Sequence, residues 1–492
     1  MANSPIILPP PKLASSNDSS VLPTAVPSLL AFIGPQLVTI ALLATVLIAT
    51  RFYRNDDPYN LKTIPKLPRS RIKDAYHTGQ WWRLIIPRFA PYVELAYQKA
   101  SPAPIHVSVF PGLLENFVAQ VGVKLVNANL SEIDPILQGR TAEFFNKEIG
   151  SPKQWKRVNV STIVHDVVKH VSGRIVFGEN LVDNPAFFKP MGRYSTRLVG
   201  FGMFARRLNI WPLNRIMIYI CSWILERDLA VVTRFVAEEV AKRQQQKPDS
   251  KKPFDCIQWA MEQDIPDSQK TPRLIAERLA YATSGMINTP PGTLMTLFFD
   301  AAYHRDFVDE IRTEIAEILA EDGNGWVETS ISKMKKLEAF IQESLRVSPS
   351  LAPLTGWRQV MRDEFRFDDN LVLPKGSICT FPTYYMRNDP DTFEKPEKFD
   401  PLRFVKLKEE HGGKEDLNSD AIQHRSLLFG YGRQGCPGRF YATRMMKLIV
   451  GVMISRYDIR YAGGDREKPV SWDIEPFFHP DTSIELEFRA RD

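Results

Sequence analysis

Apolar residues recur at helical spacing along most of the chain, and strand-like alternation is rare. A period near 3.6 predicts amphipathic helices in five stretches. These stretches lie at about 114–126, 160–173, 228–243, 307–318 and 332–347. Short strand patterns occur at Leu371–Val372, Ile378–Phe381 and Ser483–Phe488. The pattern therefore predicts a mainly α fold with small β sheets.

A longer helical pattern runs from Pro272 to about Ala302 and contains several helix breakers. Gly285, Pro290, Pro291 and Gly292 all fall within it. A proline inside a helix removes a backbone hydrogen bond and causes a kink. Such local departures from good helix design often mark functional sites. We therefore expect a kinked helix that contributes to function.

One apolar stretch, residues 28–50, has no charged residue and differs from the amphipathic helices. At ~1.5 Å per residue it can cross a hydrocarbon core of ~30 Å. Arg51 and Arg54 follow it and predict a cytosolic C-terminal side. A cleaved signal peptide is the alternative, but the run is long and begins far from the N-terminus. The pattern predicts one transmembrane helix.

The segments around this helix have distinct compositions. Residues 1–27 are rich in proline, serine and small side chains, which predicts a disordered lumenal tail. Asn17 in this tail begins an Asn-Asp-Ser sequence and is a candidate glycosylation site, an unused sequon being the alternative. Residues 51–75 combine prolines with basic side chains and predict a linker, and we expect residues 76–492 to form one large domain.

Composition excludes several classes of protein. The 492 residues are 44% hydrophobic and 24% charged, which is ordinary for a globular protein. The net charge is only +6 and no basic patch interleaved with aromatics stands out, so we expect no nucleic-acid partner. The cysteines are scattered without CxxC spacing, which argues against a disulfide framework or a zinc site. They are Cys221, Cys256, Cys379 and Cys436.

Cys436 lies between a glycine-rich loop and a helical pattern. Gly430 and Gly432 can adopt positive φ and allow a tight turn. Pro437 suits a first helical position, which would place Cys436 at a helix N-terminus. Unpaired N–H groups and the helix dipole there favour a thiolate, which is what an axial haem ligand requires. The alternative is an inert cysteine in a turn.

This stretch resembles the haem-binding signature of cytochrome P450. Phe429, Gly432, Cys436 and Gly438 match its specified positions, whereas Gln434 stands where the family usually has Arg or His. The resemblance implies the cytochrome P450 haem-thiolate fold, with haem b as cofactor and Cys436 as the axial ligand of its iron. It also implies that one charged contact to a haem propionate is missing at Gln434.

Two further motifs strengthen the resemblance. Glu343 and Arg346 lie at i and i+3 on one helix face, and Arg403 follows later in the chain. A surface ion pair is the alternative reading of the first two. They resemble the family's buried Glu–Arg–Arg triad, which supports the cysteine loop structurally. Arg358 matches a basic residue that often meets a haem propionate, with a solvated surface arginine as its alternative.

The kinked helix resembles the segment that the family places across the haem from the cysteine, where an acid–Thr pair binds dioxygen and supplies protons. Two registers fit. If Thr289 is the family threonine, Asn288 replaces the acid. If Gly285 is the family glycine, Asn288 takes the threonine position, as in the sterol 7α-hydroxylases and prostacyclin synthase. A helix kink without a chemical role is the third possibility.

The resemblance implies a monooxygenase that hydroxylates a lipophilic small molecule with dioxygen. The chain resembles the microsomal enzymes of fungal secondary metabolism, whose substrates are often terpenoids or alkaloids. The resemblance further implies a single-pass protein of the endoplasmic reticulum membrane with a cytosolic catalytic domain. Electrons would come from NADPH–cytochrome P450 reductase. Asn288 motivates one alternative, a haem-dependent isomerase or dehydratase. Gln434 and a short region before His106 motivate another, a non-catalytic membrane protein of the same fold.

Overall fold

The computed structural model describes most of the chain from Val126 onward. The described residues are 126–207, 213–247, 250–323, 326–347, 355–366, 372–381, 383–412, 417–421, 427–430, 435–464, 472–474 and 477–491. The predicted lumenal tail with Asn17, the membrane helix and the linker lie outside these ranges. Within the ranges, no helix is both long and apolar enough to cross a membrane.

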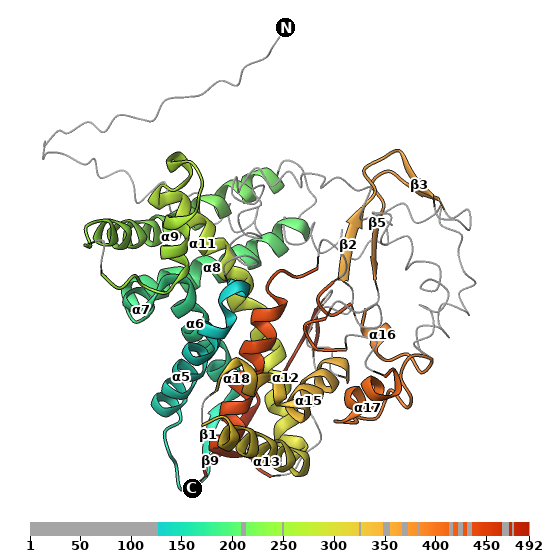
Figure 1. The fold of residues 1–492 in the computed structure, drawn as a ribbon. Coiled ribbons are helices and arrows are strands. Elements are labelled where there is room, and N and C mark those ends of the chain that lie inside the picture. The colour runs from blue at the N-terminus through green and yellow to red at the C-terminus, as the bar shows by residue number, and fades with distance from the viewer. Residues whose placement is uncertain are drawn as a thin grey trace, which may run out of the picture. The chain divides into compact units, whose positions relative to one another are not determined.

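Helices dominate the described chain, as the sequence pattern predicts (Figure 1). In chain order they are η6 (Asn127–Asn129), α5 (Leu130–Glu148), α6 (Val160–Phe177), α7 (Glu179–Val182), α8 (Pro185–Arg207), α9 (Leu213–Gln244), α10 (Cys256–Glu262), η7 (Asp267–Gln269), α11 (Pro272–Asn288), α12 (Pro290–Tyr303), α13 (Arg305–Glu321), α14 (Glu328–Lys333), α15 (Lys335–Val347), α16 (Thr383–Arg387), α17 (Arg403–Glu410) and α18 (Arg439–Arg456).

The strands of the described residues form four small antiparallel sheets. In chain order the strands are β1 (Lys156–Asn159), β2 (Thr355–Gln359), β3 (Glu364–Arg366), β4 (Val372–Pro374), β5 (Ile378–Phe381), β6 (Tyr457–Tyr461), β7 (Trp472–Ile474), β8 (Phe477–His479) and β9 (Glu485–Ala490). One sheet has the order β1-β9-β6, and the others pair β2 with β5, β3 with β4 and β7 with β8.

The core is built where α12 and α18 pack together. α12 also packs against α6, and α18 also packs against α5 (Figure 1). Leu294, Leu297 and Phe298 on α12 are fully buried, as are Leu448 and Ile449 on α18. α12 is apolar on nearly every side, which is typical of a helix surrounded by other elements.

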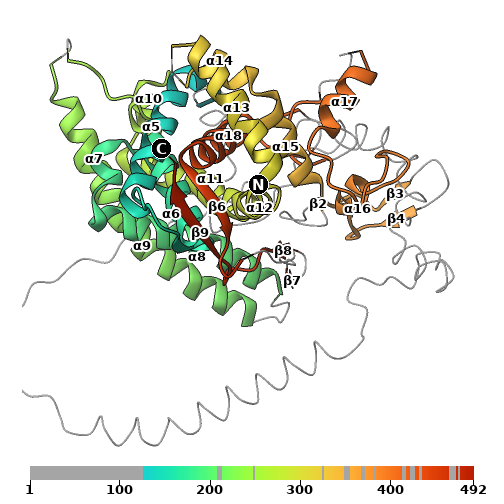
Figure 2. The ribbon, with the colours of Figure 1, turned by 90° about the horizontal axis from the view of Figure 1, so that it is seen from below.

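The three-stranded sheet extends this core. β6 continues directly from α18 and lies beside it, and Figure 2 shows β6 and β9 in dark red. Ile459 of β6 lies opposite Phe488 of β9. The hydroxyl of Tyr461 donates a hydrogen bond to the carbonyl of Phe299 on α12, at 3.0 Å. The sheet is therefore joined to α12 by this bond as well as by apolar packing.

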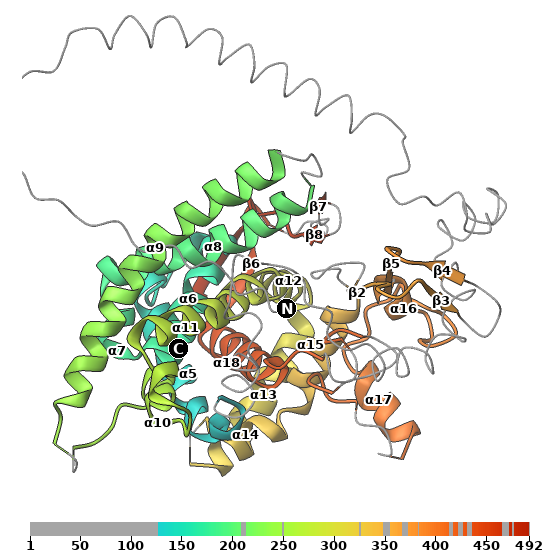
Figure 3. The ribbon, with the colours of Figure 1, turned by 90° about the horizontal axis from the view of Figure 1, so that it is seen from above.

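A second group of helices consists of α8, α9 and α11, which pack against one another (Figure 3). α9 is much longer than the predicted stretch at 228–243. The apolar pattern did not single out α8, because Pro190 lies inside it and glycines weaken its helix propensity. α8 forms because its buried face packs against α9 and α11, and such tertiary contacts override local propensity.

The predicted long helix is present as α11 and α12, separated only by Thr289. Thr289 keeps helical backbone angles, with φ −84° and ψ −46°. Pro290 begins α12, where its missing N–H is tolerated. Gly285 and Gly292 lie inside the two helices and do not interrupt them. The interruption between the two helices is therefore confined to Thr289, whereas the helix breakers extend from Gly285 to Gly292.

One helix and one strand begin at other residues in the structure than the sequence predicts. The helix expected from about Ser332 begins at Lys335, because Met334 separates it from the short α14. The closing strand expected at Ser483–Phe488 is present as β9, shifted by two residues. Ser483 instead lies in a turn, where its N–H and hydroxyl both donate to a carboxylate oxygen of Asp481.

Arg444 on α18 joins this helix to α5 and α14, and one of its two partners is the buried carboxylate of Asp134. Arg444 on α18 donates to Asp134 Oδ2 through Nη1 and to Glu328 Oε1 on α14 through Nη2. Asp134 Oδ1 has no hydrogen-bond partner within the described part of the chain. Burial raises the pKa of Asp134 to about 6, against the opposing charge of Arg444.

We expect Asp134 to lower the stability of the protein as the pH rises from about 4 to about 6. The folded state binds this proton more tightly than the unfolded chain. The contribution is therefore complete below the unfolded pKa of 3.8 and is lost as the pH passes the folded value of about 6. The shift of about two pKa units sets an upper bound of about 3 kcal/mol. Wild type should lose melting temperature relative to Asp134→Asn across this range in thermal unfolding experiments.

Asp166→Asn is the control for this experiment, because it removes an exposed carboxylate paired with Lys169. A difference between wild type and Asp134→Asn that stays constant from pH 4 to pH 7 would contradict the prediction.

Candidate functional site

The cysteine loop is closed by two backbone hydrogen bonds. The N–H of Cys436 donates to the carbonyl of Phe429 at 2.7 Å, and the N–H of Gly430 donates to that of Leu427 at 3.0 Å. Gly430 has a φ of 77°, which fits the sequence expectation of a tight turn. Leu427 also has a positive φ, 46°, which is uncommon for a non-glycine residue. These turns bring Phe429 and Cys436 together.

The helix after the loop begins later than the sequence predicts. α18 starts at Arg439 with Gly438 as its N-cap, so the placement of Pro437 at the first helical position is wrong. Pro437 lies in the preceding turn, because the N–H of Arg439 first bonds to the carbonyl of Cys436, at 3.4 Å. Arg439 Nη1 donates to the same carbonyl at 3.2 Å. Cys436 is thus fixed just before α18 and outside its first turn.

The thiol of Cys436 is free and partly buried. Burial raises its pKa, while the N–H of Gly438 and the positive charge of Arg439 act in the opposite direction. Burial is therefore the largest influence on this pKa, and the Gly438 N–H acts in the direction that the sequence predicted. A bound metal cation would supply the missing charge, because a coordinating thiol is deprotonated.

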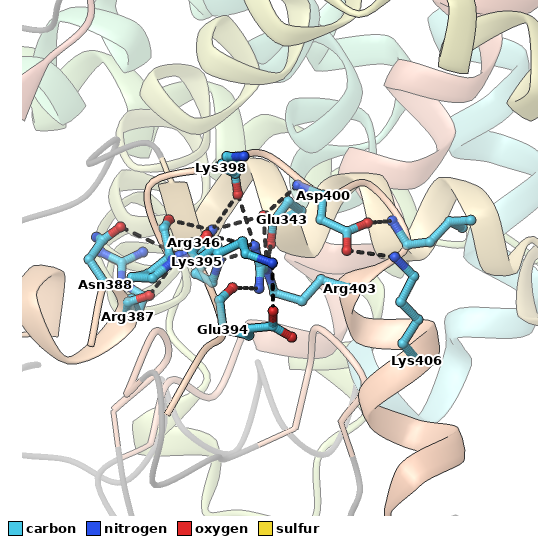
Figure 4. A network of polar contacts seen from close by, with 12 residues as sticks. Glu343, Arg346, Arg387, Asn388, Glu394, Lys395, Lys398, Asp400, Arg403 and Lys406 are labelled. Atoms are coloured by element: carbon cyan, nitrogen blue, oxygen red, sulfur yellow. Dashed lines mark hydrogen bonds and ion pairs between the residues drawn. The ribbon is translucent and has the colours of Figure 1, made fainter. Parts of the chain in front are cut away.

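The structure brings Glu343, Arg346 and Arg403 together in the protein interior (Figure 4). Arg346 donates to the Glu343 carboxylate through Nε at 2.9 Å and through Nη2 at 2.8 Å. Arg403 Nε lies 3.1 Å from each oxygen of the same carboxylate. The side chain of Glu343 is 0% exposed and that of Arg346 is 1% exposed. The alternative of a surface ion pair is therefore excluded.

Two guanidinium groups share one carboxylate, so this cluster has an excess positive charge. The remaining N–H groups donate to backbone carbonyls of the segment 387–398. Arg346 also lies over the ring of Phe393, with 5.3 Å between its Cζ and the ring centroid. The N–H of Asp400 donates to Glu343 Oε1 at 2.9 Å. The cluster therefore fixes an irregular segment that has little secondary structure of its own.

The kinked helix has one open face in an otherwise buried region. Gly285 and Thr289, one helical turn apart, are exposed or partly exposed, and Ala282 and Gly292 on the same face are partly exposed. A Cβ atom added to Gly285 would meet no atom of the described residues within 4 Å. The side chains along this face are small, so the helix presents open space.

The side chain of Asn288 points away from the face of Gly285 and Thr289 and binds helix α8. Its Nδ2 donates to Ser195 Oγ on α8 at 2.7 Å and to the carbonyl of Ser284 at 2.8 Å. The open face is therefore shared by Thr289 and Gly285, while the amide of Asn288 is bound to α8. This arrangement favours the register in which Thr289 takes the family threonine position.

Some predicted site residues lie beyond what the structure describes. Gly432, Gln434 and the side chain of Arg358 fall outside it. The backbone of Arg358 lies in β2, opposite Cys379 of β5. The roles of these three residues stay predictions.

Sequence reasoning missed two residues that contact the site. Asn127 Nδ2 donates to the carbonyl of Pro437, beside Cys436, at 3.1 Å. Ser195 binds Asn288 across 93 positions of sequence. Neither residue belongs to a motif, and no local pattern could have indicated these contacts.

These residues fit a haem-thiolate site on two observations. Cys436 is a free sulfur ligand in a loop closed by its own backbone, with the Gly438 N–H directed at the sulfur. The second is the face of small residues around Gly285, which no described side chain covers. The helices that follow these two features, α18 and α12, pack against each other.

Comparison with known proteins also indicates a haem-thiolate protein. The family model described as Cytochrome P450 matches residues 125–488. The chain is 43% identical to aspergilol synthase AuAP450 of Aspergillus ustus, covering 94% of both chains. It is 37% identical to the cytochrome P450 monooxygenase sttB of Aspergillus terreus, covering 92% of this chain and 95% of the relative. The alignment with aspergilol synthase spans 515 positions, more than the 492 residues of this chain.

A solved structure shows the same fold at low sequence identity. The structure is that of retinoic acid bound cyanobacterial CYP120A1, which is 18% identical to this chain with a TM-score of 0.55. The match covers 76% of this chain and 78% of CYP120A1. Together with the monooxygenase relatives, the family match over most of the chain identifies the enzyme class. The chain therefore belongs to the cytochrome P450 family and is a monooxygenase of that family.

Proposed function

We propose that the chain hydroxylates a lipophilic secondary metabolite with dioxygen, using haem b held by Cys436. The observation that carries the proposal is the cysteine loop, in which Cys436 is held by Phe429 and approached by the Gly438 N–H. A cysteine thiolate supplies electron density to haem iron and favours cleavage of the O–O bond. Gly432 and Gln434 would complete the contacts of this loop with the haem.

The triad has a supporting role in this proposal. Glu343, Arg346 and Arg403 lie on and between the helices and loops that precede Cys436, and none of them is exposed. They would hold the 387–398 segment in place whether or not the cofactor is bound. Arg358 would face a haem propionate.

Thr289 is the residue we place on the oxygen side. It lies on the open face of the kinked helix, one turn after Gly285, and its hydroxyl can both donate and accept a hydrogen bond. The amide of Asn288 is occupied by Ser195 and Ser284. The isomerase or dehydratase alternative depended on Asn288 occupying the threonine position, so this geometry favours monooxygenation.

The substrate is proposed to be a terpenoid or alkaloid of a secondary-metabolite pathway. One relative is named for the synthesis of aspergilol, and others are named as fungal monooxygenases. Electrons would come from NADPH through a membrane-bound cytochrome P450 reductase, because the chain has no flavin or nicotinamide motif of its own.

We also propose the membrane arrangement read from the sequence. Residues 28–50 would cross the endoplasmic reticulum membrane once and residues 51–75 would link them to the cytosolic catalytic domain. Residues 1–27 would be lumenal, with Asn17 available for glycosylation.

The cofactor assignment is tested by the reduced, carbon-monoxide-bound difference spectrum of the expressed membrane fraction. We expect a Soret maximum characteristic of thiolate ligation in wild type and its loss in Cys436→Ala. Incubation with NADPH, reductase and candidate metabolites should then yield products one oxygen atom heavier. Folded wild-type protein without the thiolate signal would support the non-catalytic alternative.

We expect Glu343→Gln to destabilise the protein by about 3–5 kcal/mol, because it leaves two buried guanidinium groups without a countercharge. Denaturant unfolding measures the loss, and the haem content of the purified variant should fall with it. Glu364→Gln is the matched control, because it breaks the exposed pair with Arg366 and should change little. Equal losses in both variants would contradict the supporting role of Glu343.

We expect removal of residues 1–50 to move the protein from the membrane fraction to the soluble fraction after an alkaline wash. The truncated protein should keep the thiolate spectrum, because it retains residues 76–492, which we expect to form the whole catalytic domain. Equal membrane retention of the truncated and full-length proteins would contradict the predicted anchor.

A further inference from the structure

Asn288 is the last residue of α11, and its amide nitrogen is surrounded by oxygen atoms. Nδ2 lies 2.7 Å from Ser195 Oγ, 2.8 Å from the Ser284 carbonyl and 3.4 Å from the Ser195 carbonyl. Ser195 lies on α8 and is fully buried. The contact therefore joins the end of α11 to the interior face of α8.

The chemistry of this contact requires a donor at position 288. Backbone carbonyls accept hydrogen bonds and cannot donate, and two of the three surrounding oxygens are carbonyls. The amide of Asn288 has two N–H groups to offer, which fixes its nitrogen toward them. A carboxylate at this position would face two carbonyl oxygens and could be satisfied only by the hydroxyl of Ser195. The surroundings of Asn288 are thus suited to an amide and unfavourable to an ionised acid.

The position of the contact connects it to the proposed oxygen site. Thr289 follows Asn288 directly and is the single residue between α11 and α12. Pro290 has no backbone N–H and cannot donate a hydrogen bond at this junction. The backbone here therefore makes fewer hydrogen bonds that could fix its geometry. The side-chain bond from Asn288 to α8 supplies a tertiary restraint at this place.

We propose that Asn288 and Ser195 form a latch between α8 and the kink, and that Asn288 positions Thr289 without carrying protons to it. The latch deepens the proposed function, since the role of Thr289 rests on that function. It assigns to residue 288 a mechanical role in place of the acid–base role that an aspartate or glutamate would have there. Protons reach Thr289 by a route that does not include this side chain.

Hydrogen exchange of the full-length holoprotein tests the latch directly. Ser195→Ala removes the hydroxyl acceptor and should increase amide exchange in peptides covering residues 281–292 by about fivefold, the factor that one neutral hydrogen bond is worth. Asn288→Ala loses this bond and also the contacts with the Ser284 and Ser195 carbonyls, so its increase should be at least as large. The double variant should match Asn288→Ala, because the Ser195 hydroxyl has no amide to bind once Asn288 is gone.

Two controls are available on α8. Thr196→Ala removes an exposed hydroxyl from the neighbouring position and should leave the exchange of residues 281–292 unchanged. Ser195→Thr keeps the hydroxyl and should stay within about twofold of wild type. Unchanged exchange in Ser195→Ala, or effects that multiply in the double variant, would overturn the latch.

Asn288→Asp separates a positioning role from proton transfer. The readout is the share of NADPH electrons recovered as hydrogen peroxide, with reductase and dioxygen but no added substrate. Two electrons and two protons convert dioxygen to hydrogen peroxide, whereas four of each convert it to two molecules of water. A carboxyl that carries protons would lower the peroxide share.

The latch predicts the opposite sign for Asn288→Asp. At neutral pH the ionised carboxylate of this variant faces the two carbonyl oxygens, which cannot donate to it, and only the Ser195 hydroxyl can. The latch should therefore weaken and the peroxide share should rise. It should return toward wild type at lower pH, where the protonated carboxyl can donate again. A fall in the peroxide share at neutral pH would overturn the proposal. Wild-type protein that consumes no NADPH would count against the proposed function instead, and the exchange experiment would still decide the latch.

Discussion

The burial of one carboxylate with two guanidinium groups determines the structure of the chain ahead of the cysteine loop. Glu343 balances only one of the two positive charges of Arg346 and Arg403, and water has almost no access to the cluster. An unsolvated charge in the interior is costly, so the spare N–H groups must find other acceptors. The 387–398 segment supplies them as backbone carbonyls. The charge imbalance thus selects one conformation for a segment that neither helix nor sheet would fix.

The backbone of that segment shows how strong this selection is. Lys395 has a φ of 47°, a left-handed conformation that is unfavourable for a residue with a side chain, and its carbonyl accepts from Arg403 Nη2 at 3.3 Å. Such a conformation persists where the surroundings over-determine it. Phe393 is fully buried beneath Arg346 and adds an apolar contact to the same restraint. The loop is therefore shaped by buried ions and their hydrogen bonds, and the arginines are as necessary to its conformation as the carboxylate.

The sequence predicted those features whose signals are local. α6 and α13 follow a regular apolar period, and the break at Thr289 follows from the prolines beside it. The triad could be identified from motif spacing and resemblance, but its carbonyl partners could not, because they depend on how the 387–398 segment folds. The contact of Asn127 with the Pro437 carbonyl spans 310 positions and has no sequence pattern. The start of α18 was misplaced, since a turn bond to the Cys436 carbonyl precedes the helix and proline is compatible with either position.

The two sides of the proposed haem site are held by interactions of different strength. On the cysteine side, breaking the buried ion cluster costs about 3–5 kcal/mol. On the helix side, the neutral bond between Asn288 and Ser195 is worth about 1 kcal/mol. Because the population of an open state falls exponentially with its free energy, this single bond opens far more often than the ion cluster breaks, while α8 stays packed against α9 and α11. The weak bond adjoins Thr289, so its opening removes a restraint at the proposed oxygen site and leaves the Glu343 cluster intact.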